Sequence, residues 1–234
     1  MTEHGGAPRT AAMTMGAVLV SLFVALGVVV HVAAAGATLD HAVLAWMVNH
    51  RHPGLTWLAI AVTNVGSPVG VAVITVGAAA VSRWRVGSAR PAILILTTLA
   101  VAGAVSTLTK LIVGAHRPAR AVQLVVETDP SFPSGHVTGT LALLGALAVV
   151  IGHHGGRAVS VTVIALAAAG TVAVAFTRLY LGVHWVTDIV GGLLLGAAAV
   201  VSAYVAYRRM MGPTQVGDRP APSAVSGPVA TVGG

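Results

Sequence analysis

Three short stretches of the chain carry residue types that together could transfer a phosphoryl group. They are Lys110 with Arg117-Pro118, then Pro133-Ser134-Gly135-His136, then Arg178 with His184 and Asp188. In a chain that is only 8% charged, each stretch lies near the end of an apolar segment. Three cations can hold a phosphate, one histidine can attack the phosphorus, and a second can protonate the leaving group. The combination predicts phosphoryl transfer that uses neither a metal ion nor another cofactor.

The elements that must position these residues are apolar helices. The chain is 56% hydrophobic with a mean hydropathy of +0.89, well above a soluble domain, and a spanning helix needs roughly 20 apolar residues. Six segments fit, at about residues 12–34, 55–81, 91–113, 136–152, 159–177 and 185–207. The sequence therefore predicts an all-α integral membrane bundle of six transmembrane helices. It divides into a tail at 1–11, a membrane domain at 12–207 and a disordered tail, rich in Gly, Pro and Ser, at 208–234.

Basic residues outside the motifs predict the orientation of the bundle. If the six segments alternate, one side carries Arg9, Arg83, Arg85, Arg90, Arg157, Arg208, Arg209 and Arg219, and the other only Arg51 and Arg120. The positive-inside rule makes the first side cytoplasmic, together with both termini. All three motifs then lie on the extracytoplasmic side. The first segment could instead be a signal peptide cleaved near Ala33-Ala34-Ala35, which would leave the other five segments unchanged.

The net charge of +7 and the pI of about 11.3 could by themselves suggest a nucleic-acid partner. The arginines are spread over segment ends and form no stripe with stacking aromatic residues, so we expect no nucleic acid. The chain has no cysteine, which excludes disulfides. His50 with His52, and His153 with His154, lack carboxylates at ligand spacing and are typical of solvated loops rather than of a metal site.

Helical spacing suggests how each motif is arranged. Lys110 and Arg117 are two helical turns apart and would share a face if the third helix continues, unless they are only cations at a helix end. Ser134 is a plausible N-cap, and Gly135 lets a ligand approach the free N–H groups of the helix start. The alternative for this motif is an ordinary capped helix with a histidine at the interface.

His184 and Asp188 are four positions apart at the start of the sixth segment, so they should share a helix face. A carboxylate on one imidazole nitrogen fixes the tautomer and leaves the other nitrogen free to attack. Asp188 is followed by an apolar run, where an acidic group is costly and is a functional candidate by default. The alternative is a pair that only helps the bundle to pack.

Three further features complete the expectations. Residues 38–50 are typical of an amphipathic helix on the outer interface, with Asp40 on its polar face or as a cap. Residues 64–68 interrupt the second segment, which favours a kink or close helix packing. Glu127 and Asp129 precede the second motif and either select the substrate or, as we favour, are plain loop residues.

Taken in order, the three motifs resemble those of the type-2 phosphatidic acid phosphatase (PAP2) superfamily, which includes membrane lipid phosphatases and undecaprenyl-diphosphate phosphatases. The resemblance covers roughly residues 12–207. Thr177 stands where the family usually has Ser, which keeps the hydroxyl. The resemblance implies that His184 forms a phosphohistidine, Asp188 orients it, and His136 protonates the leaving oxygen and then activates water. It also implies a set of groups that hold the phosphoryl oxygens, namely Lys110, Arg117, Arg178, Ser134 and the Gly135 amide.

The expected function is therefore a lipid phosphatase at the outer leaflet of a bacterial cell membrane. The first-choice substrate is a polyprenyl (undecaprenyl or decaprenyl) diphosphate recycled during cell envelope biogenesis. Phosphatidic acid and phosphatidylglycerol phosphate are the alternatives. A lipid phosphotransferase, or a non-enzymatic lipid-phosphate binder or transporter, is the alternative of another class. Partners are the lipid phosphate and the surrounding membrane lipids, and the oligomeric state stays open.

Overall fold

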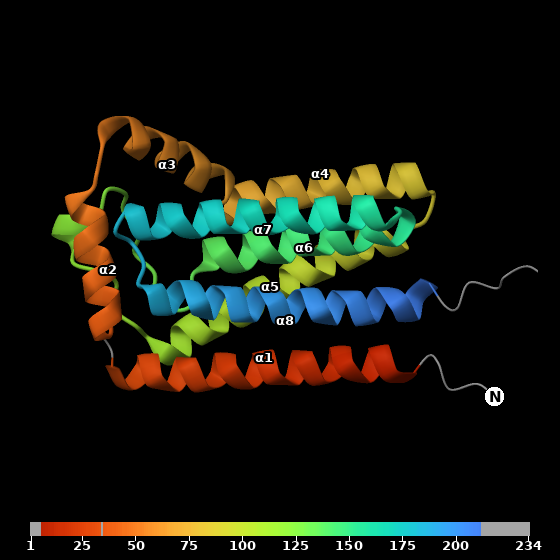
Figure 1. Cartoon of the computed structure of the whole chain (residues 1–234), viewed down its shortest axis with the longest axis horizontal. Coiled ribbons are helices and arrows are strands. Elements are labelled where there is room, and N and C mark those ends of the chain that lie inside the picture. The colour runs from red at the N-terminus through yellow and green to blue at the C-terminus, as the bar shows by residue number, and fades with distance from the viewer. Residues whose placement is uncertain (1–5, 34, 212–234) are drawn as a thin grey trace, which may run out of the picture.

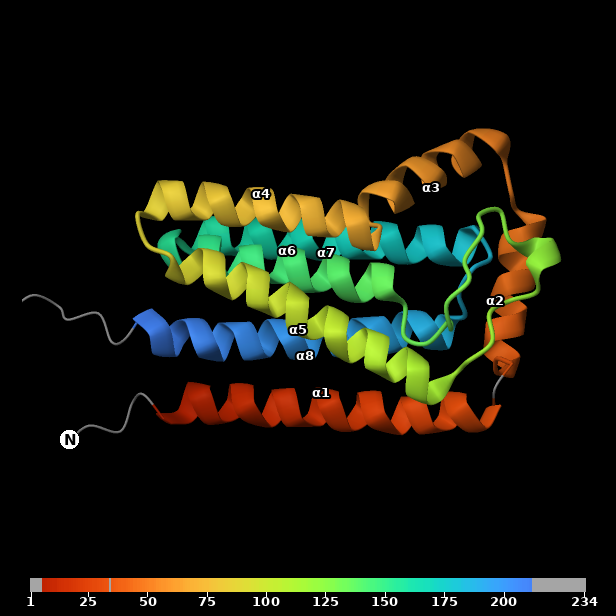
Figure 2. The same ribbon diagram turned by 180° about the vertical axis from the view of Figure 1, so that it is seen from behind.

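Eight α-helices make up the part of the chain that the computed structural model describes, residues 6–33 and 35–211. The six long ones are α1 (Gly6–Ala33), α4 (Pro68–Val86), α5 (Arg90–Val113), α6 (Gly135–His154), α7 (Arg157–Tyr180) and α8 (Val186–Met211). They run side by side, while α2 (Thr38–Asn49), α3 (Pro53–Val65) and the short turn η1 (Arg120–Val122) gather at one end (Figures 1 and 2). Between residues 6 and 211, Ala34 aside, no strand is present, which confirms the predicted all-α bundle.

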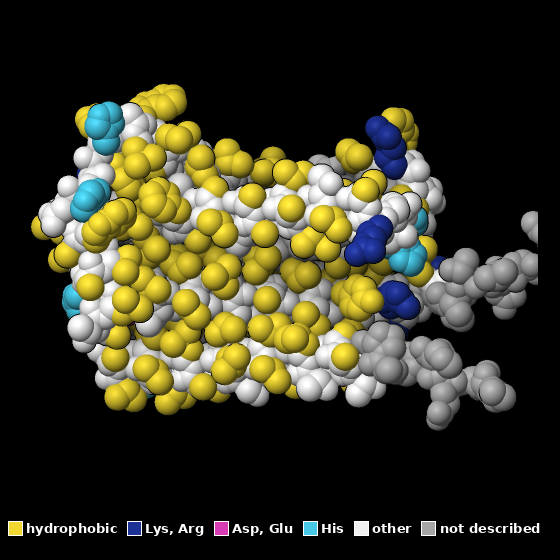
Figure 3. Space-filling view, viewed as in Figure 1, with side chains coloured by type: hydrophobic (Ala, Val, Ile, Leu, Met, Phe, Trp, Pro, Cys, Tyr) yellow, Lys and Arg dark blue, Asp and Glu magenta, His cyan; other side chains and the backbone are white. Residues whose placement is uncertain are grey.

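The outer surface of the bundle is suited to lipid. All six long helices are long and apolar enough to cross a membrane. Many of their aliphatic side chains point outward, as Val28 does with 59% of its surface exposed. Hydrophobic side chains cover the long face of the molecule, and Lys and Arg side chains gather at one end (Figure 3). A water-soluble bundle would bury such helices, so this protein is a membrane protein.

The single second segment predicted at 55–81 is wrong, because the chain breaks there into two helices. α3 ends at Val65 and α4 starts at Pro68, whose lack of an N–H suits the first turn of a new helix. Ser67 caps α4 by accepting the N–H of Gly70 at 3.0 Å. Figures 1 and 2 show α3 leaning away from the axis of α4. The interruption expected at 64–68 is confirmed, and the helix that is long enough to span is Pro68–Val86.

The helix predicted at 38–50 is confirmed as α2, which crosses the end of the bundle (Figure 1), and its place on an outer interface stays a prediction. Of the two positions expected for Asp40, the structure shows the cap: the side chain is 2% exposed and does not lie on a solvated face. Its carboxylate accepts the N–H of Ala37 at 2.8 Å and both the N–H and the hydroxyl of Thr187, at 3.0 and 3.1 Å. Because one carboxylate serves the first turns of α2 and α8, it ties the two helices together.

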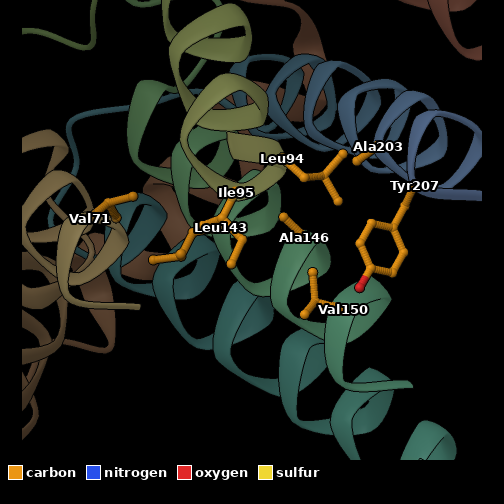
Figure 4. Packing of buried hydrophobic residues seen from close by; sticks show 8 residues of the cluster. All are labelled: Val71, Leu94, Ile95, Leu143, Ala146, Val150, Ala203 and Tyr207. Carbon is orange, nitrogen blue, oxygen red and sulfur yellow. The ribbon is translucent and has the colours of Figure 1, made fainter. Parts of the chain in front are cut away.

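Buried apolar clusters run along the bundle, from Met47 of α2 at one end to Tyr207 of α8 at the other. One buried cluster joins α4, α5, α6 and α8 through Val71, Leu94, Ile95, Leu143, Ala146, Val150, Ala203 and Tyr207 (Figure 4). A second cluster includes Phe23 of α1 and Phe132 of the long loop, whose rings stack 5.7 Å apart. Phe132 directly precedes the second motif, so this second cluster supports it from behind.

The helices at both ends of the bundle extend beyond the predicted membrane domain. α1 is already helical at Gly6 and α8 continues to Met211, while the division at 11 and 208 into tails and membrane domain stays a prediction. The rest of the predicted tails, with Arg219, and Ala34 of the alternative cleavage site lie outside the described residues. That α1 is retained rather than cleaved stays a prediction.

Close packing at Gly191 leads to the first testable prediction. A Cβ there would lie 2.3 Å from the ring of Phe132, whereas a Cβ at Gly77 would meet no atom within 4 Å. We expect Gly191→Ala to destabilise the fold by about 1–3 kcal/mol through overpacking. Gly77→Ala should be neutral or stabilising by up to about 1 kcal/mol, because alanine favours helix. Thermal unfolding in detergent, followed by circular dichroism, compares them, and equal melting temperatures would contradict this account of the packing.

Candidate active site

Helix ends bring the three motifs together at the end of the bundle that α2 and the loop 114–134 cover (Figures 1 and 2). Lys110 lies in the last turn of α5, Ser134 at the N-cap of α6, Arg178 in the last turn of α7, and Asp188 in the first turn of α8. His184 lies in the short connection between α7 and α8. The ends of four membrane-length helices, together with the connections that carry Arg117 and His184, therefore hold the candidate residues.

A cavity of about 470 Å³ opens between α4, α5 and α6 at this end. Its polar part is lined by Lys110, Arg117, Gly135, His136 and His184, together with Glu127 and Asp129. Its other side is lined mainly by small and apolar residues, Pro68, Val71, Leu99, Gly103, Ser106, Thr107, Leu111, Thr138 and Gly139. Ser134, Arg178 and Asp188 are not part of the lining. The cavity combines an anion-binding end with an apolar flank, which suits a lipid headgroup joined to its chain.

His184 and Asp188 form the buried pair that their spacing predicts. The imidazole Nδ1 lies 3.1 Å from the Asp188 Oδ2, which also accepts the Trp185 N–H at 2.9 Å. The helix begins only at Val186, so His184 stands before it rather than on its face. Because Nδ1 donates its proton to the carboxylate, Nε2 carries the lone pair.

Arg117 reaches that lone pair from the loop. Its Nη1 lies 3.1 Å from His184 Nε2 and donates to the Val183 carbonyl at 2.7 Å. The prediction that Lys110 and Arg117 share a helix face is wrong, because Gly114 ends α5 in the left-handed conformation (φ 61°). The two cations converge nonetheless, since each contacts Asp129.

The surroundings of His184 keep its imidazole neutral. Burial lowers the pKa of His184 well below its ordinary value, and the nearby charges of Arg117, Arg178 and Lys110 lower it further. A neutral imidazole whose Nδ1 proton is held by a carboxylate is the form required for nucleophilic attack through Nε2.

The start of α6 offers further donors. Ser134 occupies the N-cap position, as predicted, but its Oγ makes no capping bond; it is buried and has no hydrogen-bond partner among the described residues. Its backbone N–H donates to the Asp188 carbonyl at 3.0 Å, which fixes the second motif against the third. The first-turn N–H groups of a helix are free to bind an anion. Gly135 and His136 both line the cavity at this point.

Asp129 is not the plain loop residue that we favoured from the sequence. Its Oδ2 lies 3.0 Å from Lys110 Nζ, and its Oδ1 lies 2.8 Å from Arg117 Nη2. Partial burial raises the pKa of Asp129, but the charges of Lys110 and Arg117 outweigh this and lower it overall. The carboxylate is therefore ionised and bridges two of the three cations.

Glu127 is also not the plain loop residue that we favoured from the sequence. It pairs with Arg178, whose guanidinium is 1% exposed and also donates to the Thr63 hydroxyl at 2.8 Å. Arg178 therefore contacts the cavity through Glu127 rather than directly. Sequence reasoning missed Thr63, since a threonine in an apolar helix carries no signal of such a role.

Arg51 is another residue whose role the sequence concealed. It was counted only as an outer-side cation, yet its guanidinium donates to the Val122 carbonyl at 2.7 Å and to the Tyr180 carbonyl at 3.2 Å. Burial lowers its pKa. Gly182, at φ 69°, makes room for this contact, because a Cβ there would lie 2.7 Å from Arg51 Nη2. The sequence held one sign of this close contact, the glycine at 182 between Arg178 and His184.

Within the part of the chain that the structure describes, histidine and acidic side chains do not gather into a metal-binding cluster. Across residues 6–33 and 35–211, no three histidine, aspartate or glutamate side chains are placed to share a metal ion. That the reaction needs no metal stays a prediction.

Comparison with known proteins identifies relatives of the chain. The family model described as the PAP2 superfamily matches residues 68–211. Over 82 residues the chain is 39% identical to YbjG of Escherichia coli (strain K12), a candidate undecaprenyl-diphosphatase; the match spans 35% of this chain and only 37% of that relative. The fold is similar to the crystal structure of a transmembrane PAP2 type phosphatidylglycerolphosphate phosphatase from Bacillus subtilis. The TM-score is 0.74 at 22% identity, over 86% of this chain and 98% of that one.

The depressed pKa of His184 can be tested in the free protein. We expect the ¹⁵N signals of His184, assigned by comparison with His184→Gln, to stay those of a neutral imidazole as the pH falls through 6.5. Arg117→Gln should raise this pKa by removing a nearby positive charge. Between its folded pKa and about 6.5, the unfolded chain binds a proton that the folded protein does not, so stability should fall as the pH falls through this window. A titration of His184 near pH 6.5 would contradict the assignment.

Proposed function

The chain belongs to the PAP2 superfamily, and from that premise we propose that it is a membrane lipid phosphatase acting through a phosphohistidine. The observation that carries the proposal is the His184–Asp188 pair, whose Nε2 lies 3.1 Å from the Arg117 guanidinium at a cation-lined cavity. The apolar flank of the same cavity suits the chain of a lipid. A protein that only packs helices would need neither the buried His184–Asp188 pair nor the cation-lined cavity beside it.

In the first step, His184 Nε2 attacks the phosphorus of the lipid phosphate. A nitrogen–phosphorus bond forms while the bond from phosphorus to the leaving oxygen breaks. His136, in its protonated form, gives its proton to that oxygen. Asp188 stabilises the positive charge that develops on His184. The cationic side chains and the first-turn amides of α6 stabilise the phosphoryl oxygens as their charge grows.

In the second step, water replaces the histidine on phosphorus. His136, now neutral, takes a proton from the water as its oxygen attacks. The nitrogen–phosphorus bond breaks, inorganic phosphate forms, and His184 returns to its neutral state. His136 thereby regains the proton that it gave to the leaving oxygen. His136 therefore transfers the proton in both directions, while His184 is first the nucleophile and then the leaving group.

For the substrate we favour a polyprenyl diphosphate. Support comes from the partial similarity to a candidate undecaprenyl-diphosphatase and from a cavity whose apolar flank lies between long helices. Phosphatidylglycerol phosphate is the second candidate, since the similar fold belongs to a protein named for that substrate. Phosphatidic acid follows. Transfer of the phosphoryl group to a lipid acceptor, or binding without turnover, are the outcomes that would replace hydrolysis.

The proposed location is the cell membrane, with the active site outside and both termini in the cytoplasm. Arg83 and Arg85 end α4, Arg157 starts α7, and Arg208 and Arg209 end α8, all at the end of the bundle opposite the site. Figure 3 shows this gathering of cations at one end. The positive-inside rule assigns such an end to the cytoplasm. Residues 12–207 would then form the membrane domain.

Turnover by the purified protein in detergent tests the proposed chemistry. Polyprenyl diphosphate, phosphatidylglycerol phosphate and phosphatidic acid are compared side by side, with and without EDTA. We expect phosphate release from the preferred lipid, unchanged by EDTA, and a loss of more than about 10³-fold in His184→Ala because the nucleophile is gone. His184 should carry the label when ³²P-lipid is quenched in base, where phosphohistidine survives.

Each alternative gives a different result in the same assay. Phosphate release retained in His184→Ala would exclude the phosphohistidine, and inhibition by EDTA would exclude a metal-free reaction. Label transferred to an added lipid alcohol instead of water would identify a phosphotransferase. No release from any lipid would identify a binding protein.

The cysteine-free chain allows a direct test of orientation. Ala121→Cys lies in exposed η1 beside the site, and Ala89→Cys lies in the exposed turn before α5 at the other end. We expect a membrane-impermeant maleimide to label Ala121→Cys in intact cells, because the site faces outward, and to label Ala89→Cys only after lysis. The reverse pattern would place the site in the cytoplasm.

A further inference from the structure

Glu127 and Asp129 occupy positions that a bound phosphoryl group would need. We propose that these two carboxylates are internal anions that hold the phosphate-binding cations between turnovers and are displaced by the substrate. On this view they determine how tightly the site retains phosphate, and so contribute to specificity. The inference rests on the proposed phosphatase function and concerns the same site.

Asp129 presents two oxygens to two cations, as a phosphoryl group would. One oxygen lies 3.0 Å from Lys110 Nζ and the other 2.8 Å from Arg117 Nη2. Carboxylates and phosphates are bound by arginine with the same paired geometry. Arg117 Nε also donates to the Asp129 backbone carbonyl at 2.7 Å, which holds the residue in place. A phosphoryl group that contacts both cations would have to replace the Asp129 side chain.

Glu127 supplies the charge that Arg178 requires. A guanidinium that is 1% exposed is strongly destabilising without a partner. Glu127 is its ionic partner among the described residues and is itself accessible from the cavity, which it lines. A phosphoryl oxygen could take over this role only as Glu127 leaves.

The two kinds of residue differ in how firmly they are held. Lys110 and Arg178 lie in the last turns of α5 and α7, whereas Glu127 and Asp129 lie in a stretch without regular secondary structure. About half of the Asp129 side-chain surface is exposed. The exchange therefore moves the Glu127 and Asp129 side chains and leaves Lys110 and Arg178 in place, while Arg117 stays bonded to the Asp129 backbone carbonyl. It makes and breaks ionic contacts only, with no covalent step.

This competition acts unequally on substrate and product. The lipid contacts the apolar flank of the cavity with its chain, in addition to its phosphoryl contacts, and the chain also keeps it in the bilayer beside the site. Inorganic phosphate is held by the polar contacts alone. The returning carboxylates therefore oppose the product far more than the substrate, and they favour its release.

Binding of inorganic phosphate to the purified protein, measured by calorimetry, tests the proposal without requiring turnover. We expect Asp129→Asn and Glu127→Gln each to bind phosphate about tenfold more tightly than the unmodified protein, because one competing charge is removed. Phosphate should also become a stronger inhibitor of lipid turnover in both variants. Thr128→Ala, the uncharged exposed neighbour on the same loop, is the matched control and should bind phosphate as the unmodified protein does.

If the two carboxylates have only a structural role, their removal will not make phosphate binding tighter. Unchanged or weaker phosphate binding in Asp129→Asn and Glu127→Gln, with lower melting temperatures, would overturn the proposal. If Glu127→Gln is unstable, the proposal requires that added phosphate raise its melting temperature more than that of the unmodified protein. An equal rise in the two proteins would also overturn the proposal. Arg117→Gln distinguishes a failure of this proposal from a failure of the proposed active site. If the unmodified protein binds phosphate no better than this variant, the proposed active site itself is wrong.

Discussion

Positive charges gathered at the edge of a membrane must be neutralised, and this requirement organises one whole end of the protein. Two unit charges about 4 Å apart interact by about 4 kcal/mol near a protein surface, compared with about 1 kcal/mol in water. Lys110, Arg117 and Arg178 are brought together in such surroundings. Two carboxylates from the loop 114–134 reach them, and that loop is long enough to carry both acids past three helix ends. The fold thus provides counter-charges from a segment that is not itself a helix.

Backbone groups fix the remaining geometry. Asp40 holds the first turn of α8 to α2, Arg51 holds the end of α7 to η1, and Ser134 donates its N–H to the carbonyl of Asp188. Each contact joins elements that are far apart in the sequence. A polar side chain bonded to a main-chain group at low exposure keeps its geometry well, because leaving the partner unpaired is costly. The reacting groups are therefore held by a rim of polar contacts above an apolar bundle.

Local patterns in the sequence explain which features could be predicted. Six apolar runs, the spacing of His184 and Asp188, and the break before Pro68 are local properties, and the helices, the pair and the interruption follow from them. The path of the chain after Gly114 is not local: a single left-handed residue ended α5 and moved Arg117 from a helix face into a loop. Tyr180, a partner of Arg51, and Thr187, a partner of Asp40, each lie more than a hundred positions away, so no periodicity could indicate them.

The break between α3 and α4 has a consequence for how such an enzyme would meet its substrate. α3 leans away from α4 (Figure 2), and α4 and α5 line the apolar side of the cavity. A lipid that reaches the cavity from that side would not leave the bilayer. The quantity that governs the rate is then the mole fraction of substrate among the other lipids, rather than its concentration in bulk water. Diluting the same amount of substrate with inert lipid would slow the enzyme, and adding buffer would not.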